Sequence, residues 1–279
     1  MSTDELSSGK GHRDENFPVA SWLLRPQHRP PILAFYRFAR AADDVADHPT
    51  ATREAKMKLL DEMERTLMGE LDSSHDALSL RQVLDKHKLS PQHPLMLLEA
   101  FRRDVTKLRY ASWDELMDYC RFSAMPVGRF VLDVHGEART TWPASDALCA
   151  ALQVINHLQD CAKDYRELDR VYLPLDRMAQ FAVTPEMLGE AKASPGLRTL
   201  IAALAKQTSD LLAQAKIFAS QIHDRRLALE VSVIQALAED LDAKLLRRDP
   251  LSERVHHRKV DLPKLLLLAF ARFLGTRSS

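Results

Sequence analysis

The chain is poor in features that would place it in a β-rich class. Only 8 of its 279 residues are glycine. We find neither alternating strand pairs nor Asn-Gly hairpins. Apolar residues make up 46% of the chain, and they recur with a period of about 3.6 residues. The sequence therefore predicts an all-α protein that is long enough to bury a sizeable core.

Other absences narrow the partners and the compartment. The formal net charge is zero, because 39 basic residues balance 39 acidic ones, so we expect no nucleic acid partner. The three cysteines, Cys120, Cys149 and Cys161, have no C-x-x-C spacing and fall in predicted helices, which favours reduced core thiols in a cytosolic protein. Residues 1–14 are polar and lack the apolar core of an export signal, so we expect a flexible tail there.

A polar stripe runs along the stretch from Ile32 to Asp47, which reads as a helix. The stripe consists of Tyr36, Arg40, Asp43 and Asp47, within a wedge of about 60°. Its flanks are mostly apolar, the reverse of a surface helix. Two carboxylates at i, i+4 repel each other, and in a buried site one would keep its proton unless a cation lay between them. The alternative is a solvated acidic turn, partly neutralised by neighbouring arginines.

A second stripe of the same kind lies between Leu148 and Tyr165. It consists of Gln153, Asn156, Asp160 and Asp164, within a wedge of about 80°. Chance amphipathicity explains one such stripe more readily than two. If the stripes face each other across a cavity, they offer hard oxygen ligands from two sides. Mg²⁺ that bridges to a substrate phosphate is held in this way, with water and phosphate completing the octahedron.

These motifs resemble a known family. DDVAD (Asp43–Asp47) and NHLQDCAKD (Asn156–Asp164) look like the paired aspartate-rich motifs of the squalene and phytoene synthases, and RVYLP (Arg170–Pro174) follows at the family's spacing. The resemblance begins near Glu15. The strings ENFPVASWLLRP (15–26), FYRFARAADDVADHP (35–49) and YCRFSAMPVGRFVL (119–132) are similar to the bacterial hydroxysqualene synthase branch, HpnC.

The resemblance implies a fold and a site. It implies a single isoprenoid-synthase-type helical domain over residues 15–279, built around a central apolar cavity. It implies 2–3 Mg²⁺ ions, bound with the substrate diphosphate and without NADPH. The implied metal ligands are Asp43, Asp47, Asn156, Asp160 and Asp164. The implied substrate-binding residues are Phe17, Arg40, Phe122, Gln153, Asn156, Arg170 and Tyr172. The implied catalytic residues are Tyr36, Arg40, Asp43, Asp47, Asp160 and Asp164.

The resemblance also implies an activity. Presqualene diphosphate would ionise, rearrange and capture water to give hydroxysqualene, in a bacterial cytoplasm and coupled to a presqualene diphosphate synthase. Two alternatives stay open: a sister enzyme that condenses two prenyl diphosphates to presqualene diphosphate or phytoene, and a helical adaptor without catalysis. Squalene synthases that perform both half-reactions have Tyr where Phe122 stands, which disfavours the condensation. The four motif aspartates are intact, which disfavours the adaptor.

Three further expectations concern single segments. Pro126 and Gly128 predict a kink in a helix over Trp113–His135. We expect His75, His87 and His93 to be exposed. The segment Leu262–Leu274 is too short to span a bilayer, so it either closes the core or lies in the membrane interface, where it would make the protein membrane-peripheral.

Overall fold

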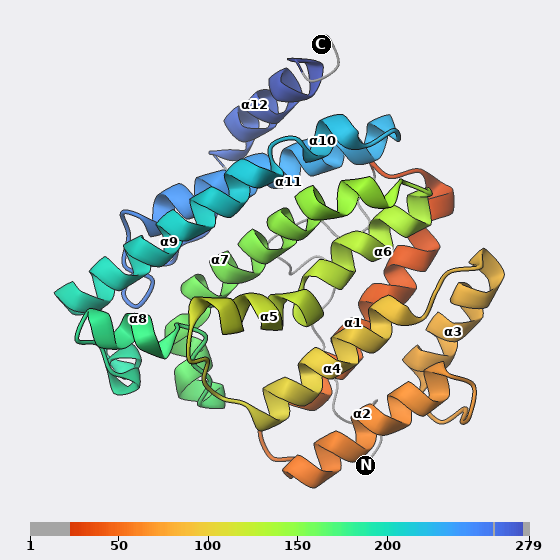
Figure 1. Ribbon diagram of the computed structural model, residues 1–279, viewed down its shortest axis with the longest axis horizontal. Helices are drawn as coiled ribbons and strands as arrows, with labels where there is room; N and C mark the ends of the chain where they lie inside the picture. Colours follow the sequence, from red (N-terminus) through yellow and green to blue (C-terminus); the bar gives the residue numbers. More distant parts are fainter. Residues whose placement is uncertain (1–22, 259, 276–279) are drawn as a thin grey trace. The chain divides into compact units, whose positions relative to one another are not determined.

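The structure is a computed structural model that describes residues 23–258 and 260–275 (Figure 1). Its regular elements are helices. Within these residues no strand forms, and extended pairing there is limited to a parallel bridge between Arg109 and Val171. The predicted all-α class is confirmed.

The helices divide into two compact units, each described here by itself. The first comprises residues 23–107 and 126–138, and the second comprises residues 108–125, 139–258 and 260–275. The domain limits of 15–279 and the central cavity stay predictions. The expected tail, residues 1–14, lies outside the described residues.

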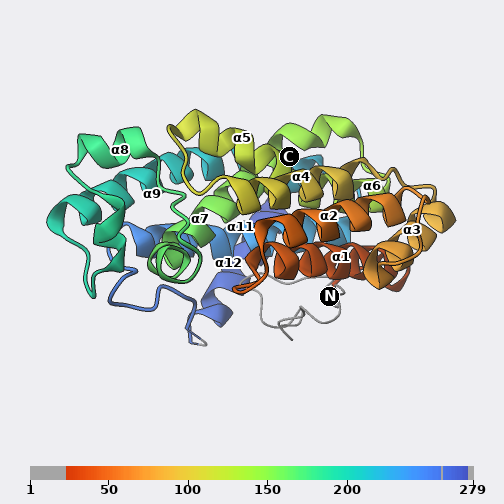
Figure 2. The ribbon, with the colours of Figure 1, turned by 90° about the horizontal axis from the view of Figure 1, so that it is seen from below.

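The first unit packs its helices around an aromatic and aliphatic core (Figures 1 and 2). They are α1 (Arg29–Asp47), α2 (Arg53–Leu67), α3 (His75–His87), α4 (Gln92–Thr106) and α6 (Met125–His135), preceded by the 3-10 turn Pro26–His28. Both α1 and α2 pack against α3 and α4. Phe35 of α1 stacks on Phe130 of α6, with ring centroids 4.1 Å apart. The apolar flanks of α1 are therefore core.

Local signals set the ends of α1. It begins at Arg29, ahead of the predicted start at Ile32, because Pro30 and Pro31 fall in the first turn of the helix, where a missing N–H costs no hydrogen bond. It ends at Asp47, as predicted, because His48 precedes a proline and takes an extended ψ of 123°.

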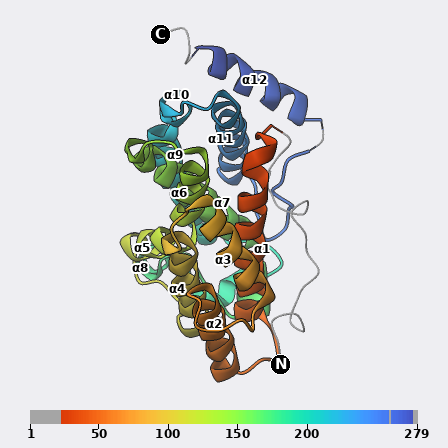
Figure 3. The ribbon, with the colours of Figure 1, turned by 90° about the vertical axis from the view of Figure 1, so that its right-hand side faces the viewer.

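The second unit is arranged along one long helix (Figures 1 and 3). Its helices are α5 (Trp113–Ser123), α7 (Trp142–Leu168), α8 (Leu175–Gln180), α9 (Pro195–Ala215), α10 (Phe218–Gln221), α11 (Arg225–Leu245) and α12 (Leu262–Gly275), with 3-10 turns at Arg139–Thr141 and Pro185–Gly189. The 27-residue α7 packs against α5, α9 and α11. The side chains of Ser112, Ser194 and Asp224 accept hydrogen bonds from the first turns of α5, α9 and α11.

The predicted kink at Pro126 is a full break between two helices. α5 ends at Ser123, and Ala124 leaves the helical region with φ −123° and ψ −49°. α6 then starts at Met125, so Pro126 sits in a first turn, where its missing N–H costs no hydrogen bond.

The expected exposure of the histidines is correct for two of them and wrong for the third. His75 and His87 are exposed. His93 is buried at 2% exposure, and its Nε2 lies 2.9 Å from a carboxylate oxygen of Asp133. The helix α4 places His93 on the same buried side as Pro94 and Leu97, a fact that its spacing from other histidines could not reveal.

The C-terminal helix α12 packs on α11 through Leu265, Ala269 and Phe273, which are buried. The sequence predicts that this segment either closes the core or lies in the membrane interface. Packing against the core describes one face of the helix. No helix in the described part of the chain is long and apolar enough to cross a membrane.

Candidate active site

The stripe on α1 carries its own cation. Arg40 places one guanidinium nitrogen 3.0 Å from a carboxylate oxygen of Asp43 and the other nitrogen 3.0 Å from Asp44. Asp44 is buried at 7% exposure, whereas Tyr36, Asp43 and Asp47 are half-buried. The helix spacing brings these groups together, because i, i+3 and i, i+4 partners share one face. The acidic-turn alternative required solvation, and the burial of Asp44 argues against it.

Negative charge is crowded around Asp43. Burial, followed by the charge of Asp47, raises the pKa of Asp43 to about 7, while Arg40 acts in the opposite direction. Asp104 of α4 adds to the rise, and it is itself buried at 5% exposure. Sequence reasoning missed Asp104. The signal was an acidic residue at a core position of α4, on the same side as the buried Leu97 and Ala100.

The stripe on α7 is half-buried along its length. Gln153, Asn156, Asp160 and Asp164 have intermediate exposure, between buried neighbours such as Val154, Ile155 and Leu158. Lys163 is exposed, as expected for a residue about 100° around the helix from Asp164. The polar stripe predicted from the sequence therefore matches the half-buried side chains on this helix, and the predicted apolar neighbours are buried.

The backbone brings Arg170 and Tyr172 to the end of α7. Asp169 caps the helix in the left-handed region at φ 51°. The backbone N–H of Arg170 then donates to the carbonyl of Asp164 over 3.1 Å, and that of Val171 donates to Leu108 over 2.9 Å. An ion pair of 2.6 Å between Arg109 and Asp169 closes the turn. These bonds hold the segment that follows α7 beside Asp164.

Tyr172 is anchored by an aromatic cluster. Its ring stacks on that of His157 from α7, with centroids 3.6 Å apart and an interplanar angle of 15°. Tyr110 and Tyr119 flank it, with centroids 5.6 Å and 5.5 Å away. Burial lowers the pKa of His157 to about 3, and the charge of Arg170, which is itself buried, acts in the same direction. His157 is therefore a neutral ring at pH 7, and sequence reasoning missed it.

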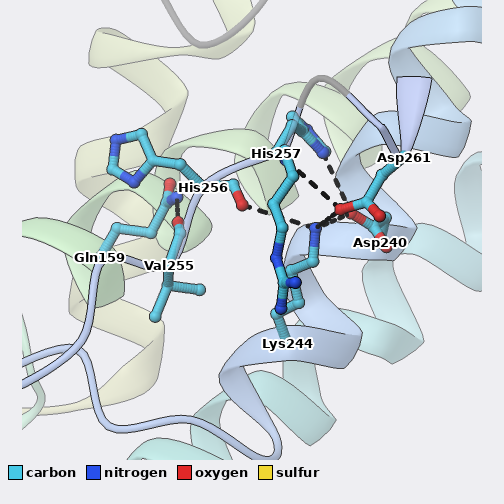
Figure 4. Close-up of polar contacts among 8 residues, drawn as sticks. Gln159, Asp240, Lys244, Val255, His256, His257 and Asp261 are labelled. Carbon is cyan, nitrogen blue, oxygen red and sulfur yellow. Dashed lines mark hydrogen bonds and ion pairs between the residues drawn. The ribbon is translucent and has the colours of Figure 1, made fainter.

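A strap between α11 and α12, described for residues 255–258 and 260–261, also reaches α7 (Figure 4). The side-chain amide of Gln159 donates to the carbonyl of Val255. Burial, followed by the charge of Arg254, lowers the pKa of His256. The carboxylate of Asp160 lies close enough to act in the opposite direction. Four helices, α8 to α11, separate His256 from α7 in the sequence, so no local pattern pointed to it.

Two of the expected aromatic groups are placed, and one is not. Tyr36 is half-buried on α1 and Phe122 is half-buried on α5. Phe17 lies outside the described residues. The structure thus brings together Arg40 with Asp43 in one unit, and Arg170 and Tyr172 with the α7 stripe in the other. That the two stripes face each other stays a prediction.

A family profile described as squalene/phytoene synthase matches residues 11–262 of the sequence. The chain belongs to the squalene/phytoene synthase family. Members of this family typically use Mg²⁺.

Individual relatives agree with this family. The sequence is 55% identical to the hydroxysqualene synthase of Rhodopseudomonas palustris, over 93% of this chain and 89% of that protein. It is also 55% identical to the hydroxysqualene synthase of Zymomonas mobilis, over 95% of this chain and 90% of that one. The resemblance to the hydroxysqualene synthase branch is confirmed.

Solved structures share the fold. The crystal structure of squalene synthase HpnC from Alicyclobacillus acidocaldarius matches with a TM-score of 0.74 and 32% identity, covering 88% of this chain and 92% of that chain. A dehydrosqualene synthase matches with a TM-score of 0.77 over 99% of this chain and 97% of its own, at 22% identity, which speaks for the fold alone. The predicted isoprenoid-synthase type of helical fold is confirmed.

The donor set suits Mg²⁺ in this family. Among the described residues no group of three or more His, Cys, Asp and Glu side chains is gathered tightly enough to hold a metal unaided. Mg²⁺ typically binds through one or two carboxylates, with water and substrate phosphate as its other ligands. The pairs Asp43/Asp47 and Asp160/Asp164, spaced i, i+4 and half-buried, fit that coordination.

Proposed function

We propose that this protein is a hydroxysqualene synthase, which converts presqualene diphosphate to hydroxysqualene with Mg²⁺. The observation that carries the proposal is the identity of 51–55% to three hydroxysqualene synthases over more than nine tenths of the chain. By comparison, plant phytoene synthases reach 28–31% identity over 64–72% of the chain.

The first role of the chain is to bind a diphosphate. Asp43 and Asp47 on α1, and Asn156, Asp160 and Asp164 on α7, are the proposed ligands of 2–3 Mg²⁺ ions. When bound, Mg²⁺ would neutralise the charge that grows on the departing diphosphate. Arg40 and Arg170 are the proposed cationic contacts to its oxygens, since a guanidinium matches phosphate geometry in bidentate fashion. Gln153 is proposed to donate a hydrogen bond to the same group.

The second role is to steer a carbocation. The carbon–oxygen bond to the diphosphate breaks, and the diphosphate leaves with the electron pair. The cation rearranges, a water oxygen bonds to it, and the water loses one proton to give the alcohol. Phe17, Tyr36 and Phe122 are the proposed aromatic lining, because aromatic faces stabilise a cation by about 0.5 to 2 kcal/mol each without trapping it. Tyr172 belongs to the loop proposed to hold the diphosphate. The reaction needs no reductant, because water supplies the oxygen that bonds to the cation.

The proposal is tested by a product assay with Mg²⁺ and without NADPH, in which presqualene diphosphate and farnesyl diphosphate are supplied separately. We expect hydroxysqualene from presqualene diphosphate alone. We expect Asp160→Asn to lower turnover at least a thousandfold with the fold intact, because the substitution removes one of the two carboxylate charges that α7 offers to Mg²⁺. Glu167→Gln, an exposed substitution on the same helix, should leave turnover unchanged.

Other products would overturn the proposal in distinct ways. Consumption of farnesyl diphosphate would assign the protein to the condensing branch and would show that Phe122 does not prevent that step. Folded protein inactive on both substrates would favour the adaptor. In the proposed setting the enzyme works in a bacterial cytoplasm, on presqualene diphosphate supplied by a separate synthase.

A further inference from the structure

The helix α12 exposes an apolar face that the fold does not cover. Its inner face, Leu265, Ala269 and Phe273, is buried against α11. Its other large apolar side chains are exposed: Leu262 37%, Leu266 50%, Leu267 69%, Leu268 43%, Phe270 49% and Leu274 49%. We call Leu266, Leu267, Phe270 and Leu274 the outer face of α12. These four span an arc of about 100° on the helix.

This concentration is unusual within the molecule. Seven of the thirteen exposed large hydrophobic side chains in the described part of the chain lie between Val260 and Leu274. The others are scattered singly over the remaining helices and loops, as is normal for a protein surface. A contiguous apolar patch, in contrast, typically marks a surface that contacts a protein or a membrane.

The connections of α12 to α11 keep this face turned outward. Lys244 bonds Asp261 over 3.1 Å and Asp240 over 2.5 Å, and the Nδ1 of His257 lies 3.0 Å from Asp240 (Figure 4). Further along the helix, Arg272 pairs with Glu239. The start and the last turn of α12 are thus fixed to α11 by ion pairs, and the inner face stays engaged.

The charge on α12 itself has one sign. α12 contains no acidic residue, and its two basic residues are Lys264 and Arg272. Lys264 is exposed, as is Arg258 in the strap. Two acidic residues beside the helix are paired: Asp261 with Lys244, which lowers the pKa of Asp261, and Glu239 with Arg272. Positive charge therefore borders an apolar surface, the combination that favours an anionic lipid interface over a neutral one.

The dimensions fit a helix that lies on a membrane. A helix of 14 residues is about 21 Å long, short of the roughly 30 Å hydrocarbon core. The exposed leucines and Phe270 occupy a broad arc, wider than the narrow seam with which one helix packs on another in a coiled coil. Such an arc can sink between lipid chains while Lys264 stays at headgroup level.

We propose that the outer face of α12 docks on a bilayer that contains anionic lipid, with the helix axis in the plane of the interface. The proposal goes beyond the proposed function and does not depend on it, since it rests on the side chains of α12 and the strap. The partner is a lipid surface with negatively charged headgroups.

The test is co-sedimentation of the full chain with vesicles of phosphatidylcholine, with or without phosphatidylglycerol. We expect binding to the vesicles that contain phosphatidylglycerol, weakened by added salt. The double variant Leu267→Ser/Phe270→Ser should lower the partition at least tenfold, and Lys264→Glu should lower it severalfold. The matched control is Ile217→Ser, which removes an exposed apolar side chain (56%) elsewhere in the same unit and should bind like the wild type.

The single variant Leu267→Ser is the second test, because its side chain is the most exposed on the helix and contributes least to folding. Circular dichroism checks that each variant is folded. Equal binding by the wild type and the folded Leu267→Ser/Phe270→Ser variant would overturn the proposal, as would no binding by the wild type. A dimer that Leu267→Ser dissociates would also overturn it, in favour of a second copy of the chain. Turnover of presqualene diphosphate in detergent should be the same in all of these variants, so a failure here is distinct from a failure of the proposed reaction.

Discussion

Two buried carboxylates, one in each unit, are held by opposite means. In the first, Asp44 is buried at 7% exposure with a guanidinium nitrogen of Arg40 at 3.0 Å. In the second, Asp242 of α11 is buried at 4% exposure, and its contact is the hydroxyl of Ser209, which donates over 2.6 Å. Its other oxygen, Oδ1, is buried with no hydrogen-bond partner in the described part of the chain.

The charge of Asp44 is stabilised by a cation, whereas, among the residues that the structure describes, the charge of Asp242 is not stabilised by an ion pair of this kind. On α1 the cation lies on the same helix as the proposed metal ligands, so negative charge can be concentrated there in the folded protein. On α11 burial raises the pKa of Asp242 to about 6, although the bond from Ser209 opposes the rise. We infer that the first arrangement serves binding, whereas the second is a local cost of packing α9 against α11.

Removal of the cation should produce the largest effect. Arg40→Met removes the guanidinium that lies 3.0 Å from the buried Asp44 carboxylate, and we expect a loss of about 2–4 kcal/mol in the free energy of unfolding, together with loss of turnover. Arg37→Met is the matched control, because Arg37 is exposed on the same helix, and it should cost less than about 0.5 kcal/mol. Denaturant unfolding measures both. Equal losses in the two variants would show that Arg40 does not hold the charge.

An intermediate loss of activity is expected when the aromatic stack between Tyr172 and His157 is removed from the second unit. Tyr172→Leu removes the stack on His157, and we expect kcat/KM to fall about tenfold, in line with about 0.5–1.5 kcal/mol for an aromatic pair. Tyr172→Phe keeps the stack and should stay within about threefold of the wild type. If both variants lose the same activity, the hydroxyl and not the stack is responsible.

The smallest effect should have the opposite sign. The folded pKa of Asp242 is raised above its unfolded value, so its protonated form stabilises the fold at low pH, and this contribution is lost as the pH rises through about 6. Asp242→Asn should therefore melt a few degrees above the wild type at pH 7.5, a gain of no more than about 1 kcal/mol.

The gain should shrink toward pH 5, where the wild-type carboxyl binds its proton in the fold. Thermal melts at both pH values, followed by circular dichroism, measure it. A gain that does not depend on pH would show that packing, and not ionisation, separates the two proteins. Asp44→Asn serves as the contrast and should destabilise the fold at pH 7.5, because it removes one of the two carboxylates that pair with Arg40.

Sequence reasoning found the side chains that recur with the helical period, and it missed the residues that only the tertiary fold brings next to them. The stripes on α1 and α7 were visible because helical geometry fixes which side chains share a face. The end of α1 followed from proline chemistry, which also predicted a kink at Pro126 where the structure has a full break. The resemblance supplied the branch of the family, which spacing alone would not have given.

Tertiary neighbours carry no such signal. Asp104 lies near the α1 stripe but belongs to another helix, α4. His157 lies on an apolar side of α7. His256 lies near Asp160 but belongs to the strap, about 95 residues further along the chain. His93 was expected at the surface because an isolated histidine without a partner in sequence usually lies there, and it is paired with Asp133 instead. The composition of α12 showed that it is apolar, but only packing on α11 distinguished its two faces.

The bond between Gln159 and Val255 also sets an order of events during synthesis. Val255 follows Gln159 by 96 residues, so α7 leaves the ribosome long before Val255 does. Folding of a nascent chain proceeds from the N-terminus, so α1 can pair Arg40 with Asp44 while translation continues. The surroundings of Asp160 cannot be completed until His256 has been made. We therefore expect a ribosome-bound chain that stops before residue 255 to lack the finished α7 site, even though every aspartate of both motifs is already present.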